Sequence, residues 1–244
     1  MFSIACISFC AVCAVSALIS SPATANQNHA AGFLLKTIKL NSKAIKYVVY
    51  VPSVYDARKP IPTILFLHGK GECGTDGLRQ ITVGLGGAVM QNVEKWPYLI
   101  VFPQKQEEQN DWEQEEEMVM AILDRTIKEY NVDKNRLYLT GLSQGGHGSW
   151  AIAARHPHMF AAVAPICGWG SKWMAEKLSG TPIWAFHGTE DPIVRVDETQ
   201  KMVKFLEEAG GSCKATFYPG VGHNCWDKAY REENLYEWFL QYHK

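Results

Sequence analysis

The spacing of hydrophobic positions changes along this chain, and the change predicts its secondary structure. Residues 33–51 alternate apolar and polar side chains around Asn41 and Ser42, which is typical of an antiparallel hairpin at a sheet edge. Residues 63–67 and 98–102 are continuous apolar runs. Such runs are expected of strands that are buried on both faces of a parallel sheet.

The rest of the chain alternates short apolar runs with longer segments of helical periodicity. Further strands are expected at residues 137–140, 161–167, 183–187 and 214–218. Helices are expected at residues 78–94, 113–130, 145–155, 171–178, 197–209 and 227–243. This order predicts an α/β fold with a mostly parallel twisted sheet, an antiparallel N-terminal edge and helices on both faces.

The first 25 residues have the composition of an export signal. Residues 1–20 are almost entirely apolar and uncharged, and Ala23 and Ala25 match a small-x-small cleavage site. The segment has no early Lys or Arg, and it is nearly long enough to span a bilayer. We expect cleavage after Ala25 and a secreted or periplasmic protein, with an uncleaved membrane anchor as the alternative. Residues 26–32 then form a polar linker, and residues 33–244 a single domain.

A G-x-S-x-G pattern lies between the predicted strand at residues 137–140 and the predicted helix at residues 145–155. In a nucleophile elbow the serine has a strained backbone, and Gly141 and Gly145 would let the strand and helix approach without a Cβ clash. Ser143 would be exposed at the tip, beside helix N–H groups that favour developing negative charge. The pattern predicts a nucleophile; the alternative is a helix packed tightly on a sheet.

An acid and a base should follow later strands, because ligands of open parallel sheets bind where the strands end. Asp191 lies four residues beyond the strand at residues 183–187, and His223 lies five residues beyond the strand at residues 214–218. His223 would accept the Ser143 proton, while Asp191 would fix the imidazole tautomer. The alternatives are a turn or capping aspartate and a surface or capping histidine.

Three other residues near these strands are weaker candidates. His187 also follows a strand, but it precedes Asp191 and so breaks the expected order of Ser, Asp and His. Glu190 is the nearest substitute for Asp191. Asp197 precedes a helical run and is expected to cap that helix.

The oxyanion formed by attack on an ester requires preorganised donors. One is expected to be the backbone N–H of Gln144. The second should come from the glycine-rich loop after residues 63–67, from Lys70 or alternatively Gly71. His68 in that loop is expected to be structural rather than a base.

Charge and cysteine content exclude several classes of function. A net charge of −1 without a basic run argues against a nucleic-acid surface. Four cysteines follow residue 25, namely Cys73, Cys167, Cys213 and Cys225. They are too few for a disulfide scaffold and lack metal-ligand spacing, so neither a metal nor a cofactor is expected. A Cys213–Cys225 bond is not expected, whereas bonds from Cys167 to Cys225 or Cys73 stay open.

Five segments together resemble a known family. LFLHGKGECG, the acidic region around Trp112, RLYLTGLSQGGHGSWAIAARHPHMFAAVAPICG, HGTEDPIV and GVGHNCWDKAY resemble the secreted α/β-hydrolase esterases called predicted peptidases, feruloyl esterases or phospholipase/carboxylesterase-type enzymes. The resemblance covers nearly all of the chain after residue 25 and implies the α/β-hydrolase fold. It implies a triad and two oxyanion donors: Ser143, Asp191, His223, Lys70 and Gln144.

The chain departs from that family pattern at Lys70, at Cys73 and in a charged insert at residues 104–111. These departures leave the chemistry unchanged but affect the assignment of a substrate. The chain also resembles dienelactone hydrolases, which have a cysteine where Ser143 stands.

Short connections between the elements leave no room for a lid domain, so we expect an open groove. Trp169, Trp173 and Trp226 fall near the catalytic end, where Trp169 and Trp226 could stack on an aromatic acyl group or simply pack the loops. We predict a secreted serine carboxylic ester hydrolase that forms an acyl-enzyme, with feruloyl or acetyl esters of plant polysaccharide as substrates. The partner would be a small-molecule or polymer-linked ester, not nucleic acid, and not a membrane after signal cleavage. A serine peptidase, a lysophospholipase and a catalytically dead binding module are the alternatives.

Overall fold

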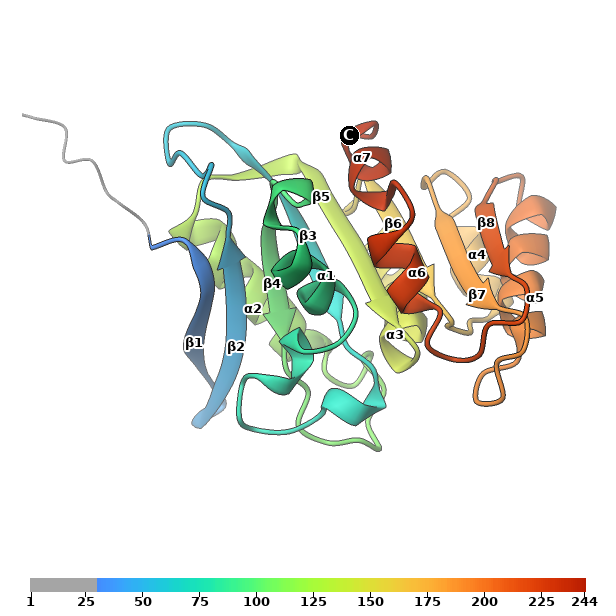
Figure 1. Cartoon of the computed structure of the whole chain (residues 1–244), viewed down its shortest axis with the longest axis horizontal. Helices are drawn as coiled ribbons and strands as arrows, with labels where there is room; N and C mark the ends of the chain where they lie inside the picture. The colour runs from blue at the N-terminus through green and yellow to red at the C-terminus, as the bar shows by residue number, and fades with distance from the viewer. Residues whose placement is uncertain (1–29) are drawn as a thin grey trace, which may run out of the picture.

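An eight-stranded sheet forms the centre of the structure, a computed structural model that describes residues 30–244 (Figure 1). The strand order is β1-β2-β4-β3-β5-β6-β7-β8. The strands are β1 Gly32–Leu40, β2 Lys43–Val51, β3 Ile61–Leu67, β4 Leu99–Pro103, β5 Val132–Leu142, β6 Ala162–Ile166, β7 Trp184–Gly188 and β8 Lys214–Tyr218. The β1–β2 and β2–β4 pairs are antiparallel and the others parallel, which confirms the predicted sheet. The predicted export signal lies outside the described residues.

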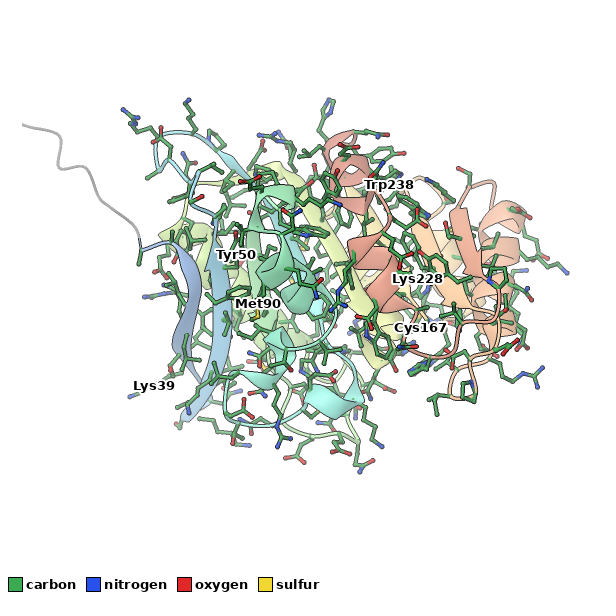
Figure 2. The ribbon with its side chains drawn as sticks, in the orientation of Figure 1. Lys39, Tyr50, Met90, Cys167, Lys228 and Trp238 are labelled. Atoms are coloured by element: carbon green, nitrogen blue, oxygen red, sulfur yellow. The ribbon has the colours of Figure 1, made fainter. Side chains whose placement is uncertain are left out.

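The two edges of the sheet differ in how they are built. At one edge, β1 and β2 are joined by Asn41 and Ser42, whose φ values of 48° and 65° suit the tight turn that was predicted. The outer strand β1 carries charged side chains such as Lys39, which points away from the sheet and discourages pairing with another chain (Figure 2). At the other edge, β8 pairs only with β7 among the described strands, and its side chains are half-buried or exposed.

Seven α-helices of the described chain cover the two faces of the sheet. They are α1 Leu85–Gln91, α2 Glu116–Glu129, α3 Gln144–Arg155, α4 Lys172–Lys177, α5 Val196–Glu208, α6 Trp226–Arg231 and α7 Leu235–Leu240. Helices α2, α3, α4 and α5 pack on one face, and α1, α6 and α7 on the other (Figure 1). The layered arrangement confirms the predicted α/β class.

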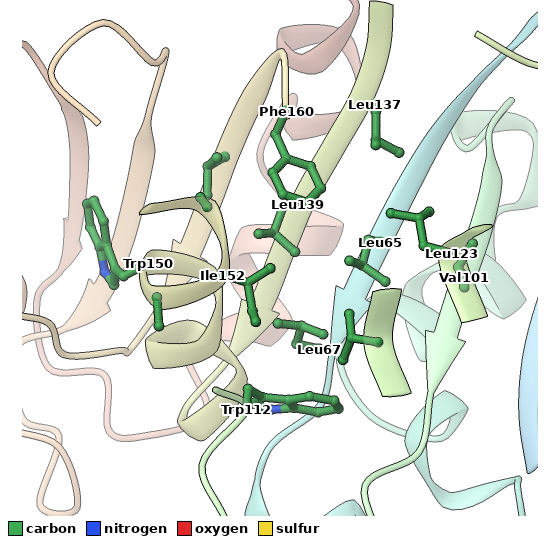
Figure 3. Packing of buried hydrophobic residues seen from close by; sticks show 14 of the residues in the cluster. Leu65, Leu67, Val101, Trp112, Leu123, Leu137, Leu139, Trp150, Ile152 and Phe160 are labelled. Atoms are coloured by element: carbon green, nitrogen blue, oxygen red, sulfur yellow. The ribbon is translucent and has the colours of Figure 1, made fainter. Parts of the chain in front are cut away.

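The cores on the two faces explain why the central strands are apolar throughout. Along β3, Leu65 and Leu67 point to the face covered by α3, while Ile64 and Phe66 point to the opposite face. All four side chains are fully buried. Figure 3 shows Leu65 and Leu67 packed near Ile152 of α3. Each such side chain contributes about 1.5–3 kcal/mol to folding, so the strand is held from both sides.

Three helix predictions were wrong in detail. The helix expected at residues 78–94 is limited to α1, with the 3₁₀ turns Arg79–Ile81 and Val93–Lys95 on either side. The helix expected at residues 227–243 is broken into α6 and α7, and Asn234, a residue that favours helix starts, stands at the boundary. Asp197 does not cap α5 but lies in its first turn, where it pairs with Arg195 and Lys201.

No helix within residues 30–244 has the length and apolar character needed to cross a membrane.

Candidate active site

Ser143 lies at a sharp junction between β5 and α3. Its φ of 54° and ψ of −117° fall in a region that non-glycine residues rarely adopt. The flanking glycines make the junction sterically feasible, since a Cβ at Gly145 would lie 1.9 Å from the carbonyl oxygen of Leu67. A Cβ at Gly141 would lie 2.3 Å from the carbonyl oxygen of Gly145. The strand-to-helix elbow therefore forms as its sequence predicts.

Loops after β7 and β8 bring Asp191 and His223 to this elbow. His223 Nε2 lies 2.8 Å from Ser143 Oγ, and His223 Nδ1 lies 2.6 Å from Asp191 Oδ2. The other carboxylate oxygen of Asp191 accepts hydrogen bonds from the backbone N–H groups of Ile193 and Val194, both at 2.9 Å. Asp191 is thus fixed in orientation, and its free edge faces the imidazole.

His187 makes a second contact with the same carboxylate. Its fully buried Nε2 lies 2.9 Å from the carbonyl oxygen of Val194 and 3.2 Å from Asp191 Oδ2. Burial lowers the pKa of His187, so the neutral ring donates through Nε2–H. Glu190, the alternative acid, is exposed. The structure therefore brings Asp191, and not Glu190, to His223.

The loop after β3 passes beside Ser143. A Cβ at Gly69 would lie 3.5 Å from the Ser143 Cβ, and Lys70 follows at the start of the 3₁₀ turn Lys70–Glu72. Lys70, Ser143 and Gln144 line one cavity of about 500 Å³. Gly71, the alternative donor, is not among the residues of the described chain that line this cavity.

His68 is a structural member of this loop. Its Nδ1–H donates to the carbonyl oxygen of Gly69 at 2.6 Å, while its Nε2 accepts from the backbone N–H of Lys105 at 2.9 Å. The indole N–H of Trp112 donates to the His68 carbonyl oxygen at 3.1 Å. Burial lowers the pKa of His68 to about 4. A neutral ring held on both sides supports the predicted structural role.

The cavity beside Ser143 is lined by aromatic, aliphatic and charged residues. Its other lining residues are Trp169, Ile193, Val194, Arg195 and Glu198. Trp226 does not line it; the indole packs edge-on against the His223 ring, with centroids 5.3 Å apart. Of the two tryptophans predicted to bind substrate, the structure therefore brings only Trp169 to the cavity. A larger cavity, of about 690 Å³, lies near Pro157 and contains none of these groups.

Comparison with known proteins identifies the family. The sequence profile described as Phospholipase/Carboxylesterase matches residues 86–234, a segment that includes Ser143, Asp191 and His223. The chain belongs to the phospholipase/carboxylesterase family.

Relatives within and beyond this carboxylesterase family support the assignment. Carboxylesterase SOBER1 of Arabidopsis thaliana is 34% identical over 116 residues, which cover 45% of this chain and 50% of that protein. The bifunctional acetylxylan esterase/xylanase XynS20E of Neocallimastix patriciarum is 27% identical over 111 residues, covering 44% of this chain and 16% of that protein. The crystal structure of a thermostable esterase superposes with a TM-score of 0.79 at 31% identity, covering 87% of this chain and 63% of that one. The matches thus span half or less of these curated relatives, and the superposition shows an α/β-hydrolase fold.

The sequence analysis missed His147, which contacts the cavity residue Trp169. Its ring stacks on Trp169 with centroids 4.6 Å apart and planes 6° apart. Its Nδ1 lies 3.0 Å from the Trp169 carbonyl oxygen and its Nε2 lies 3.0 Å from Glu113 Oε1. Burial alone would lower the pKa of His147, but these two acceptors outweigh it and raise the pKa. No local sequence signal marks His147, because its partners lie in distant segments.

The cysteines of the described chain are free thiols. Burial raises the pKa of Cys167, which lies beside Cys225. One potential metal-ligand group exists within residues 30–244, because ligand atoms of Cys167, Asp191 and His223 lie within 4.8 Å of one another. Asp191 and His223 are hydrogen-bonded to each other, and the Cys167 thiol is protonated. This set of donors is therefore poorly suited to a metal.

Proposed function

We propose that the protein is a serine carboxylic ester hydrolase with Ser143, His223 and Asp191 as its catalytic triad. The observation that supports this function best is the pair of hydrogen bonds, 2.8 Å and 2.6 Å long, that connect the three side chains beside an open cavity. Nucleophile, base and orienting acid occur in the geometry that acyl transfer requires.

The reaction has two proton-balanced halves. In the first, Ser143 Oγ attacks the ester carbonyl carbon while His223 Nε2 takes the hydroxyl proton, and Asp191 stabilises the imidazolium through Nδ1–H. The tetrahedral intermediate collapses, the C–O bond to the alcohol breaks, and His223 returns the proton to the leaving oxygen. In the second half, water replaces the alcohol and releases the acid from the acyl-enzyme by the same proton transfers.

The negative oxygen of the intermediate would bind the backbone N–H groups of Lys70 and Gln144. Both residues line the cavity that contains Ser143. The Gln144 N–H also belongs to the first turn of α3, where unpaired N–H groups and the helix dipole stabilise negative charge. Donors fixed before the reaction are worth about 10²–10³ in kcat each.

The residues that line the cavity favour an apolar acyl group. Trp169, whose ring stacks on His147, lines the cavity together with Ile193 and Val194, and such apolar residues would suit a flat acyl group such as feruloyl. A relative whose name is acetylxylan esterase favours acetyl esters instead. We therefore propose feruloyl or acetyl esters of plant polysaccharide as substrates.

Export of the protein is part of this proposal. The apolar segment at residues 1–20 and the alanines at positions 23 and 25 support cleavage of a signal and secretion or periplasmic delivery. The mass of the purified product tests it: a chain that begins at Asn26 agrees with the proposal, and an intact Met1 would favour the membrane anchor.

Burst kinetics with p-nitrophenyl acetate test the chemistry. The wild-type protein should release one equivalent of p-nitrophenol rapidly as the acyl-enzyme forms, and Ser143→Ala should lower kcat by at least about 10⁴-fold. Ser53→Ala, at an exposed position, should leave kcat unchanged. An active Ser143→Ala protein would remove the proposed nucleophile.

A substrate panel tests the second part of the proposal. Methyl ferulate, acetylated xylan and p-nitrophenyl esters of increasing chain length should separate an aromatic preference from an acetyl preference. Cleavage of peptide anilides without ester hydrolysis would favour a peptidase instead.

A further inference from the structure

Lys105 is a buried cation close to the proposed active site. It lies two residues beyond the end of β4, and none of its surface is exposed. Its Nζ donates to the carbonyl oxygens of Glu107 and Asn110, at 2.9 Å and 2.6 Å, and to Gln144 Oε1 at 2.8 Å. These three acceptors use all three N–H donors of an ammonium. The ion pairs within residues 30–244 do not include Lys105, so carbonyl and amide oxygens stabilise its buried charge in place of a carboxylate.

The side chain of Lys105 fixes Gln144. Because an ammonium only donates, the Gln144 amide must turn its oxygen toward Lys105 and its nitrogen away from it. The nitrogen then donates to the Asn110 carbonyl oxygen at 3.1 Å and to Asp111 Oδ1 at 3.0 Å. The residue whose backbone N–H is the first proposed oxyanion donor is therefore held by its side chain.

The backbone of Lys105 fixes the loop that carries the second donor. Its N–H donates to His68 Nε2 at 2.9 Å, and its carbonyl oxygen accepts from the Gly74 N–H at 3.0 Å. These two bonds hold both ends of the short loop that contains Lys70. One residue thus contacts both sides of the oxyanion site.

We propose that Lys105 is a positioning residue that holds the Lys70 and Gln144 N–H groups in register for the oxyanion. This inference rests on the proposed function, because it concerns the same site. The charged segment at residues 104–111, a departure from the family pattern, then acts as a brace for the oxyanion site and not as part of the substrate surface. The reacting atoms are not touched by Lys105 itself.

Replacement of Lys105 by methionine separates the two connections. Lys105→Met keeps an unbranched side chain and both backbone hydrogen bonds, but it removes the ammonium that donates to Gln144 Oε1. We expect kcat for p-nitrophenyl acetate to fall about 10–100-fold with KM changed less than about threefold, because the oxyanion forms only after attack. Lys39→Met, on the exposed face of β1, is the matched control and should leave both constants unchanged. An unchanged kcat, or a rise in KM alone, would overturn the inference.

A double-mutant cycle tests whether Lys105 acts through Gln144. Gln144→Met keeps the backbone N–H and should itself lower kcat about tenfold. The double variant Lys105→Met/Gln144→Met should have a kcat no lower than that of the slower single variant, because each substitution removes the same hydrogen bond. Losses that multiply in the double variant would contradict the proposed connection. If Lys105→Met fails to fold, Gln144→Met with unchanged kcat would contradict it equally.

Amide hydrogen exchange tests the positioning without turnover. Lys105→Met should speed exchange in residues 143–146 at least tenfold, because the side-chain bond to Gln144 is lost, and leave the β1–β2 hairpin unchanged. Residues 68–74 should keep their protection, because the two backbone hydrogen bonds of residue 105 remain. Exchange confined to residues 105–111 would overturn the inference. If the wild-type protein hydrolyses no ester, the proposed function fails, and the exchange result still decides whether the Lys105 side chain positions residues 143–146.

Discussion

Asp191→Asn is a sharp test of the proposed triad, because the surrounding hydrogen bonds dictate how asparagine must turn. The Ile193 and Val194 N–H groups, both 2.9 Å from Asp191 Oδ1, require an acceptor at that position. The amide oxygen of asparagine would take it, so its NH₂ group would face His223. That group would donate to Nδ1 and leave the imidazole proton on Nε2, where Ser143 could no longer be deprotonated.

We expect this inverted tautomer to lower kcat by about 10⁴-fold, equivalent to about 5.5 kcal/mol in activation free energy. Stability should fall much less, by about 1–2 kcal/mol, because His187 keeps the Val194 carbonyl oxygen as an acceptor. The measurement is kcat for p-nitrophenyl acetate, together with a urea denaturation curve. Asp124→Asn, at an exposed position of α2, is the control and should match wild type.

The same substitution in a protein that lacks His223 is a further test. In a His223→Ala protein, Asp191→Asn should change kcat by less than about threefold, since both substitutions disable one imidazole. A kcat for Asp191→Asn within tenfold of wild type would refute the tautomer argument and return Glu190 to consideration as the acid.

Three further predictions follow from the packing and the cavity. Gly145→Ala places a Cβ 1.9 Å from the Leu67 oxygen and should lower the free energy of unfolding by about 3 kcal/mol, or Tm by about 6–12 °C. The control is Gly180→Ala, whose Cβ would have no atom within 4 Å, and it should change Tm little. Equal shifts in Tm would contradict the clash. Because the pKa of His68 is lowered to about 4 in the fold, the unfolded chain takes up this proton first, so stability should fall from pH 6.5 downward by about 3 kcal/mol at pH 4. The free energy of unfolding, measured with urea at several pH values in that range, should depend less on pH in His68→Gln. An equal pH dependence in the two proteins would contradict the lowered pKa of His68. Trp169→Ala should raise KM for methyl ferulate about tenfold but for p-nitrophenyl acetate less than threefold, and equal changes would exclude stacking on the acyl group.

Features with a local physical cause could be predicted from the sequence. The run at residues 63–67 is apolar at every position because both faces of β3 are covered. Gly141 and Gly145 indicate the elbow because any Cβ there meets backbone atoms. Asp191 and His223 could be placed near Ser143 because the ends of parallel strands lie along one edge of the sheet.

Features that depend on distant partners could not be predicted. Lys105 looks like part of a charged surface segment, and only the fold reveals that its ammonium meets the Gln144 amide 39 residues away. His147 looks like an ordinary helix residue until Glu113 and the Trp169 ring are brought to it.

The position of β8 places the proposed base at an edge of the sheet. His223 hangs from a peripheral strand that is bonded on one side, whereas Ser143 is anchored in the middle of the sheet. Separation of that strand from β7 would move the proposed base away from the proposed nucleophile while most of the interior stayed intact. Heat or denaturant should therefore abolish activity at a lower temperature or concentration than is needed to unfold the tertiary structure.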